Sequence, residues 1–287
     1  MSNDKKRSND KKIGRSNTIL LIILVAVVST LTVLFFVFNG NKEPADEEKL
    51  DAAVSQAILD DNKESHKDSE CSTEGHIILG TDTNGNTLKA YLLTEFITFG
   101  FENGCFVNQS GSMVPATMTF DIADGEYRLK NIEYAKDGSD SVPSVKKMFP
   151  KEFVKRALFH TDKDSDLLWK QCCKQAESYL KSIGRKATVC RWSDLDHVMF
   201  TDLGMPVIIS NRLDEILKWQ PYYDYIGNRE IIEDGVRYVY ETEYFEDSKT
   251  LVFTKYVYDT NETVSCINMN IQTGKILSTE TAPDKVS

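Results

Sequence analysis

Short, largely apolar runs alternate with polar turn sequences between residues 75 and 135 of the chain. The runs are HIILGT, LKAYLLTEFITFGF, CFV, ATMTFDI and EYRLKNIEY. They are rich in β-branched and aromatic residues, and the turns at 83–86, 102–104 and 123–125 contain Asn-Gly or Asp-Gly, which favour hairpins. The pattern predicts an antiparallel meander.

Apolar residues recur at helical spacing on both sides of this meander. Before it, the spacing from Leu50 to Ile58 predicts an amphipathic helix from about Glu47 to Asn62. After it, Pro150 fits the first turn of a helix through Phe159, and residues 164–183 fit a longer helix ended by Gly184. The apolar stripe expected on the longer helix consists of Trp169, Cys173, Ala176, Leu180 and Ile183.

The second half of the chain repeats strands and a helix in another order. A strand is expected over 187–192, and Ser210 or Asn211 can cap a short helix through Trp219, stopped by Pro221. Strands are expected over 236–244, 251–260 and 263–271, and a short final strand follows a turn at 273–275. We interpret this half as a helix packed on a meander.

One uninterrupted apolar segment precedes all of these elements. Residues 18–38 read TILLIILVAVVSTLTVLFFVF, 21 residues without a charge, proline or glycine. A helix of that length is about 30 Å long, enough to cross the hydrocarbon core of a bilayer. The alternative is a cleaved signal peptide, whose apolar run is usually about 7 to 15 residues long and ends at a small-x-small site. The sequence FNGNKEPAD offers no good site, so we expect an uncleaved transmembrane helix.

Charge is distributed very unevenly about this segment. Residues 1–17 carry six basic and two acidic groups, whereas residues 39–287 carry 28 basic and 42 acidic groups. The positive-inside rule then predicts a single-pass protein of the cell membrane with a cytoplasmic N-terminus and an extracellular C-terminal domain. The acidic domain is expected to repel nucleic acid, so the expected partners are the bilayer through 18–38 and a membrane protein, a wall-associated protein or a cell-wall component.

The predicted fold class is therefore α+β, with one transmembrane helix followed by two antiparallel-meander-plus-helix units. The predicted divisions are a basic tail (1–17), the transmembrane helix (18–38), a stalk with the amphipathic helix (39–68), and two extracytoplasmic units (69–185 and 186–287). The six cysteines permit up to three disulfides in such a location, but their spacing matches no known framework, and we predict no pairing.

Sequence motifs of the best-marked enzyme classes are missing. The chain has no HExxH, P-loop, GxGxxG or GxSxG sequence. Ser144 and Lys147 satisfy the SxxK pattern of penicillin-recognising enzymes, but the companion motifs are incomplete. The segment that contains His66, Cys71, Glu74 and His76 matches no standard metal site. We therefore expect no catalytic residue, no metal and no cofactor, and we keep a Ser144 and Lys147 enzyme as an alternative.

Tyrosine is concentrated in the second half of the chain. Eight of the twelve tyrosines lie between residues 222 and 258. An aromatic strand face can bind a glycan or a protein, although a helix often covers such a face instead. The candidate binding residues are Tyr238, Tyr240, Tyr244, Tyr256 and Tyr258.

Several phrases of the sequence are familiar as a set: CSTEGHIILGTD (71–82), TFGFENG (98–104), MFP (148–150), IGNRE (226–230), EDGVRYVYET (233–242) and FTKYVYDT (253–260). The region from about 48 to about 280 resembles the extracytoplasmic C-terminal region of beta-lactam-sensor-like membrane metallopeptidases of Firmicutes. The resemblance implies a Gram-positive surface protein whose outer domain senses or binds a ligand. Those relatives have an HExxH in a multi-span domain that this chain lacks, so no catalytic residue transfers.

These observations favour a non-enzymatic, membrane-anchored sensor or binding protein of the bacterial cell envelope. The alternatives are an envelope enzyme that uses Ser144 and Lys147, and a structural scaffold for a membrane partner.

Overall fold

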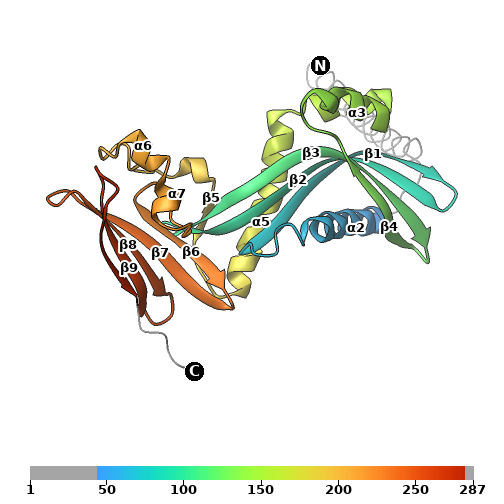
Figure 1. Ribbon diagram of the computed structural model, residues 1–287. Coiled ribbons are helices and arrows are strands. Elements are labelled where there is room, and N and C mark those ends of the chain that lie inside the picture. The colour runs from blue at the N-terminus through green and yellow to red at the C-terminus, as the bar shows by residue number, and fades with distance from the viewer. Residues whose placement is uncertain (1–43, 282–287) are drawn as a thin grey trace, which may run out of the picture. The chain divides into compact units, whose positions relative to one another are not determined.

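The structure is a computed structural model that describes residues 44–281 (Figure 1). By its internal contacts the chain divides after Ala52, within the first described helix, α2 (Pro44–Asn62). All strands belong to the unit that follows this division.

The first part of this unit contains four long strands and three helices. The strands are β1 (Cys71–Asn84), β2 (Thr87–Glu102), β3 (Cys105–Ala123) and β4 (Glu126–Tyr134). A short 3-10 turn, η1 (Gly138–Asp140), leads into α3 (Ser141–Met148), α4 (Lys151–Leu158) and α5 (Asp162–Ser182). The predicted meander and its three turns are confirmed, except that CFV and ATMTFDI belong to one continuous strand, β3.

The second part begins with β5 (Thr188–Cys190) and η2 (Trp192–Asp194). The helical turns α6 (Val207–Ser210) and α7 (Leu213–Ile216) follow. The remaining strands are β6 (Gly227–Glu233), β7 (Val236–Phe245), β8 (Thr250–Val257), β9 (Thr263–Asn270) and β10 (Ile276–Thr281). The single helix predicted up to Trp219 is wrong, because the non-helical backbone of Arg212 separates two short turns.

All ten strands form one sheet. Its main path is β10-β9-β8-β7-β6-β2-β3-β4, while β1 pairs with β2 and β5 pairs with β3. Every pairing is antiparallel except that of β3 with β5. The predicted fold class, with two separate meander units, is therefore wrong. The pairing of β2 with β6, which joins the two, involves residues far apart in the sequence.

A membrane-spanning helix was the other part of the predicted fold class. No helix among residues 44–281 has both the length and the apolar character needed to cross a bilayer. The described residues therefore form a mostly antiparallel sheet with helices and contain no membrane-spanning helix. The segment predicted to form the span, residues 18–38, lies outside them.

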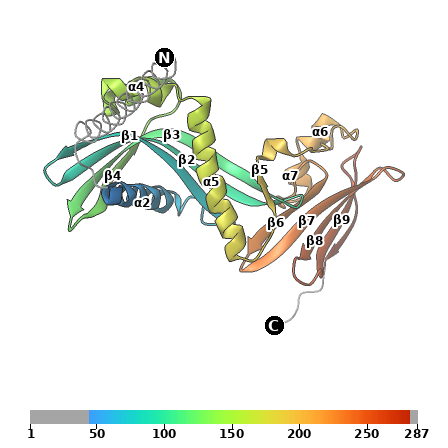
Figure 2. The ribbon, with the colours of Figure 1, turned by 180° about the vertical axis from the view of Figure 1, so that it is seen from behind.

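Helix α5 packs against β1 and β2 (Figure 2). Its capping box at Thr161 and Asp164 fixes its first turn, and Gly184, with a φ of 69°, follows its end. Its buried residues are Asp164, Leu168, Cys172, Ala176 and Leu180. The predicted stripe is right for Ala176 and Leu180, whereas Trp169 and Cys173 are half-buried and Ile183 is exposed.

Two glutamine side chains of α5 bond to the backbone of β1. Gln171 accepts a hydrogen bond from the His76 backbone N–H at 2.7 Å, and Gln175 accepts one from the Glu74 N–H at 3.1 Å. Both glutamines also donate to the backbone carbonyls of the same two residues. The helix therefore satisfies polar groups along the edge strand β1 as well as burying apolar surface.

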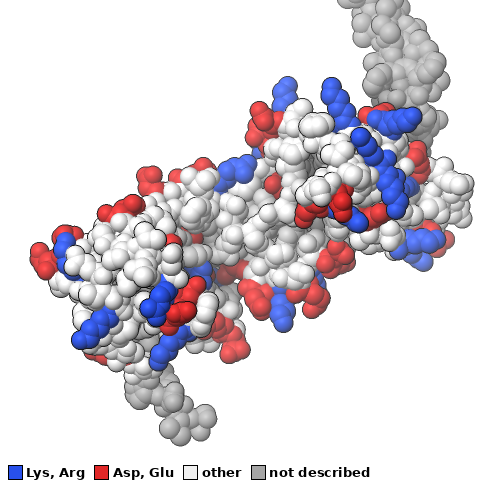
Figure 3. All heavy atoms as spheres, turned by 45° about the horizontal axis from the view of Figure 1, so that its top comes forward, with Lys and Arg blue, Asp and Glu red and all other residues white. Residues whose placement is uncertain are grey.

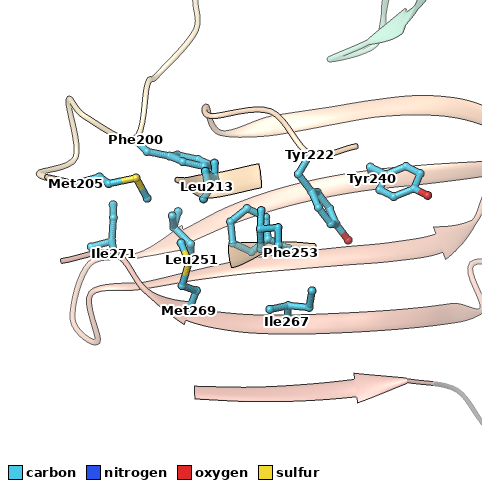
Figure 4. Close-up of a cluster of buried hydrophobic side chains, with 11 residues drawn as sticks. Phe200, Met205, Leu213, Tyr222, Tyr240, Leu251, Phe253, Ile267, Met269 and Ile271 are labelled. Carbon is cyan, nitrogen blue, oxygen red and sulfur yellow. The ribbon is translucent and has the colours of Figure 1, made fainter. Parts of the chain in front are cut away.

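The second part has its own apolar core (Figure 4). Phe253 lies at its centre, with Phe200 and Tyr222 packed edge-on against it at centroid distances of 5.9 and 5.0 Å. Leu213 and Leu217, from α7 and the turn after it, cover this face of β7, β8 and β9. Short helical turns thus cover the sheet in the second part, as the long helix α5 covers it in the first part.

Candidate functional site

The junction of β2 and β6 rests on few backbone contacts. The two strands pair only at Glu102 and Arg229, and the Asn103 N–H donates to the carbonyl of Asn228 at 3.0 Å. Asn103 also accepts the Asn228 N–H on its side chain at 2.8 Å. Gly227 has a φ of 146°, and a Cβ there would lie 2.2 Å from the Asn103 side chain, so only glycine allows this close approach.

A cavity of about 530 Å³ lies beside this junction, and we call it the junction cavity. Three segments line it: the loop before β1, one residue of β3, and the loop and strand around β6. The lining residues are Lys67, Asp68, Ser69, Glu70, Gln109, Tyr223, Arg229, Glu230, Ile231 and Ile232. Its volume is in the range of small-molecule sites, about 300–1,000 Å³.

Two arginines satisfy the two buried carboxylates of the cavity wall. Arg237 donates to both oxygens of Glu70, at 2.7 and 2.8 Å, and to Glu230 at 3.0 Å. Arg185 donates to both oxygens of Glu230, at 2.5 and 2.8 Å. Tyr179 adds a hydrogen bond to Glu70 at 2.5 Å. We call these five residues the paired cluster.

The paired cluster is held in aromatic surroundings. The Arg185 guanidinium lies 3.7 Å from the ring centre of Phe101 and 4.5 Å from that of Tyr258. Hydrogen bonds to Glu230 raise the pKa of Arg185, and for Arg237 the bonds to Glu70 and Glu230 outweigh burial and raise its pKa as well. Both arginines thus stay charged and committed to carboxylates, which leaves them unavailable to a ligand.

Arg229 differs from both of them. Its guanidinium lies 4.2 Å from the ring centre of Tyr223, also on the cavity wall. Its Nε is buried and has no hydrogen-bond partner, and no ion pair of this side chain occurs within residues 44–281. A partly buried guanidinium with unused donors costs free energy until an acceptor arrives.

A second polar group lies behind Tyr223. Tyr223 stacks on Tyr225 with ring centres 4.7 Å apart, and the Tyr225 hydroxyl donates to Glu102 at 2.6 Å. His197 Nε2 lies 2.8 Å from the same oxygen of Glu102, and Trp192 stacks over the imidazole at 4.3 Å. Burial, followed by the bond to Glu102, raises the pKa of Tyr225. Glu102 is fully buried, so this group fixes the position of the tyrosines.

The junction cavity is suited to recognise an anionic group. Arg229 can donate two parallel hydrogen bonds to a carboxylate or phosphate, and Gln109, Ser69 and Lys67 add polar groups around it. Figure 3 shows acidic and basic side chains interspersed on the visible face, so on that face no broad basic surface would attract an anion. Recognition there depends on the local donors.

The residues considered from the sequence as metal ligands lie in separate surroundings. No group of three or more His, Cys, Asp and Glu side chains among residues 44–281 is arranged to hold an ion. Of the residues considered from the sequence, Glu74 and His76 form a buried contact at 2.9 Å. Cys71 lies in the apolar core under α5, and the His66 ring packs 4.8 Å from that of Phe96.

The structure does not bring the five predicted tyrosines together. Tyr240 is buried in the second core, and Tyr238 and Tyr244 pack against that core. Tyr256 is half-buried and pairs across the strands with Val239, and Tyr258 lies beside Arg185. Their predicted binding role stays a prediction, and three of the five have a packing role.

Ser144 and Lys147 line a second cavity of about 390 Å³, together with Tyr134, Lys136 and other residues. The Ser144 hydroxyl donates to the Ser141 carbonyl at 2.8 Å and accepts the Lys136 N–H at 3.0 Å. The serine thus acts as a local hydrogen-bonding residue of α3, although it shares a cavity with the lysine.

Sequence reasoning missed Arg229, Tyr223 and the paired cluster. The phrases IGNRE and EDGVRYVYET contain Arg229, Glu230 and Arg237, so the signal was present as charged residues in a β-rich segment. The sequence does not show which of these arginines pairs with a carboxylate in the folded protein.

Comparisons with protein-family models, with curated proteins and with solved structures gave no significant match. The resemblance to the sensor-like metallopeptidases therefore stays a prediction.

Proposed function

We propose that this chain is an extracytoplasmic binding protein, not an enzyme, and that the junction cavity holds a small ligand through its carboxylate or phosphate group. The observation that carries the proposal is Arg229, whose guanidinium has no acceptor within residues 44–281 and lies on the wall of a cavity of about 530 Å³. The extracytoplasmic location rests on the contrast between the basic residues 1–17 and the acidic remainder.

The neighbours of Arg229 support binding more than catalysis. Tyr223 holds the guanidinium by a cation–π contact, and the nearby carboxylates Glu70 and Glu230 are both occupied by arginines. A general acid or base needs a group free to exchange a proton with the ligand. A cell-wall component that carries carboxylates or phosphates fits this chemistry.

The proposal is tested by thermal unfolding of the full-length chain with increasing acetate or inorganic phosphate, with chloride at equal ionic strength as the reference. One of the two anions is expected to raise the unfolding midpoint in a saturable way, because it binds the folded state only. The comparison between acetate and phosphate identifies the ligand group.

Matched variants locate the effect. Arg229→Ala is expected to abolish the rise, whereas Arg212→Ala, which removes an exposed arginine paired with Glu215, keeps it. No rise with either anion, or an equal rise in Arg229→Ala, would overturn the proposal.

A second candidate is an envelope enzyme with Ser144 as nucleophile and Lys147 as base, because both residues line the same cavity of about 390 Å³. Incubation with a labelled penicillin tests it. Covalent labelling that Ser144→Ala abolishes would support the enzyme, and absence of labelling removes it.

A further inference from the structure

Two cysteines are brought together by the parallel pairing of β3 and β5. Cys105 pairs with Thr188, and Cys190 pairs with Val107. Paired residues in a ladder point to the same face, and so do residues two apart on one strand. Cys105 and Cys190 are therefore diagonal neighbours on one face of this ladder.

Contact between the two thiols follows from this register. The side chains of Cys105 and Cys190 are close enough to form a hydrogen bond, and both residues are free thiols of intermediate burial. Of the other four cysteines, Cys71 and Cys172 are buried, and Cys266 lies on β9, which β3 does not pair with. Cys173, of intermediate burial, lies near Cys190 and is the alternative partner.

We propose that Cys105 and Cys190 are a site of reversible oxidation that forms an intramolecular disulfide. The oxidant is a small-molecule disulfide such as oxidised glutathione. One cysteine thiolate attacks a sulfur of the oxidant, whose S–S bond breaks and releases one glutathione thiolate. The second cysteine then gives up its proton and attacks the mixed disulfide, which releases the second glutathione. Two protein thiols are oxidised, and one small disulfide is reduced to two thiols.

A disulfide between Cys105 and Cys190 would fix the short strand β5 to β3. The strand β5 has only three residues and is held in the sheet by β3 alone. It leads into η2, whose Trp192 stacks on His197, and His197 in turn contacts the buried Glu102. The cross-link therefore also holds in place the segment that carries Trp192. It also closes the chain from 105 to 190 around α3, α4 and α5, which restricts the unfolded chain.

The rate of the reaction depends on pH. Burial, followed by the nearby Cys105 thiol, raises the pKa of Cys190 to about 11. The thiolate is the reactive form, so oxidation is slow at neutral pH and accelerates as the pH rises.

The test uses the purified full-length chain incubated with oxidised glutathione at several pH values. Free thiols are then alkylated, and the non-reduced digest is analysed by mass spectrometry. The expected product is a peptide pair linked through Cys105 and Cys190, lost on reduction and formed faster at higher pH. A link between Cys173 and Cys190 instead, or full alkylation of Cys105 and Cys190 after oxidation, would overturn the proposal.

Single variants serve as controls. Cys266→Ser is expected to retain the cross-link, while Cys105→Ser and Cys190→Ser lose it. The cysteine map of the unmutated chain is decisive even where a variant folds poorly. Arg229 takes no part in this reaction, so the outcome is independent of the proposed ligand site.

Discussion

Arginines on neighbouring strands of this protein occupy two opposite situations. Arg237 on β7 is 16% exposed in its side chain and donates to two carboxylates, Glu70 and Glu230. Arg229 on β6 lies on the wall of the junction cavity, and its guanidinium contacts the Tyr223 ring but has no acceptor within the described residues. An arginine that is paired with buried carboxylates has a structural role, whereas an arginine without an acceptor is available to a ligand. Four variants test the contrast.

The largest effect is expected from Arg237→Ala. This change leaves Glu70, whose side chain is 5% exposed, without its bidentate partner. Removing one member of a buried ion pair costs about 3–5 kcal/mol, because the other charge stays buried and unpaired. Urea unfolding measures the loss. The exposed pair of Arg212 with Glu215 is the control, and Arg212→Ala should cost less than about 1 kcal/mol. A similar cost for both variants would refute the structural role of Arg237.

A smaller loss is expected from Tyr225→Phe, which removes the hydrogen bond at 2.6 Å to the fully buried Glu102. Leaving a buried acceptor short of a donor costs about 1–3 kcal/mol. Its stacking partner supplies the control, because within residues 44–281 the Tyr223 hydroxyl has no hydrogen bond. Tyr223→Phe should therefore change the unfolding free energy by less than about 0.5 kcal/mol. Equal effects would show that stacking, not the bond to Glu102, holds this group.

A third arginine, Arg156, is half-exposed and lies between the two extremes. It donates to Asp164 at 2.6 Å, and this bond, followed by the Thr161 backbone N–H, lowers the pKa of Asp164 from 3.8 to about 2. A lowered carboxyl pKa stabilises the fold above the unfolded value, so this contribution is present above about pH 4 and is lost as the pH falls towards 2.

Arg156→Ala should therefore raise the Asp164 pKa and remove about 1 kcal/mol of stability at neutral pH, after allowance for solvent screening. NMR titration of the Asp164 carboxyl and unfolding at several pH values measure both effects. Lys155→Ala, on the same helix, is the control. An unchanged Asp164 pKa in Arg156→Ala would contradict this account.

The smallest effect on stability is expected from Arg229→Ala. Only the contact with the Tyr223 ring is lost, which is worth about 0.5–1 kcal/mol at a partly exposed site, and an unsatisfied buried Nε is removed as well. Urea unfolding should give a change below about 1 kcal/mol. A loss as large as that of Arg237→Ala would place Arg229 among the structural arginines and break the comparison.

Local patterns predicted the strands of the meander because the information lies in neighbouring residues. In the Asn-Gly turn at 103–104 and the Asp-Gly turn at 124–125, both residues have positive φ, as tight hairpin turns require. The buried face of α5 was predicted only in part, because apolar spacing alone says nothing of Gln171 and Gln175, whose side chains bond to β1.

The site could not be predicted in the same way. Glu70, which lines the cavity, and its partner Arg237 are 167 residues apart, and no pattern in the sequence links them. The pairing of β2 with β6 depends on one contact, Glu102 with Arg229, and on a glycine that allows Asn103 to approach. Tyrosines were chosen as binding residues by their spacing, whereas packing decided which became core.

The most direct test of the central claim is the NMR signal of the Arg229 Nε–H group, which has no acceptor within residues 44–281. The signal, assigned by its loss in Arg229→Lys, is followed while acetate or inorganic phosphate is added. The account predicts a saturable downfield shift with one of the two anions, while the signals of Arg185 and Arg237 stay in place. An Arg229 signal that does not move with either anion would contradict it.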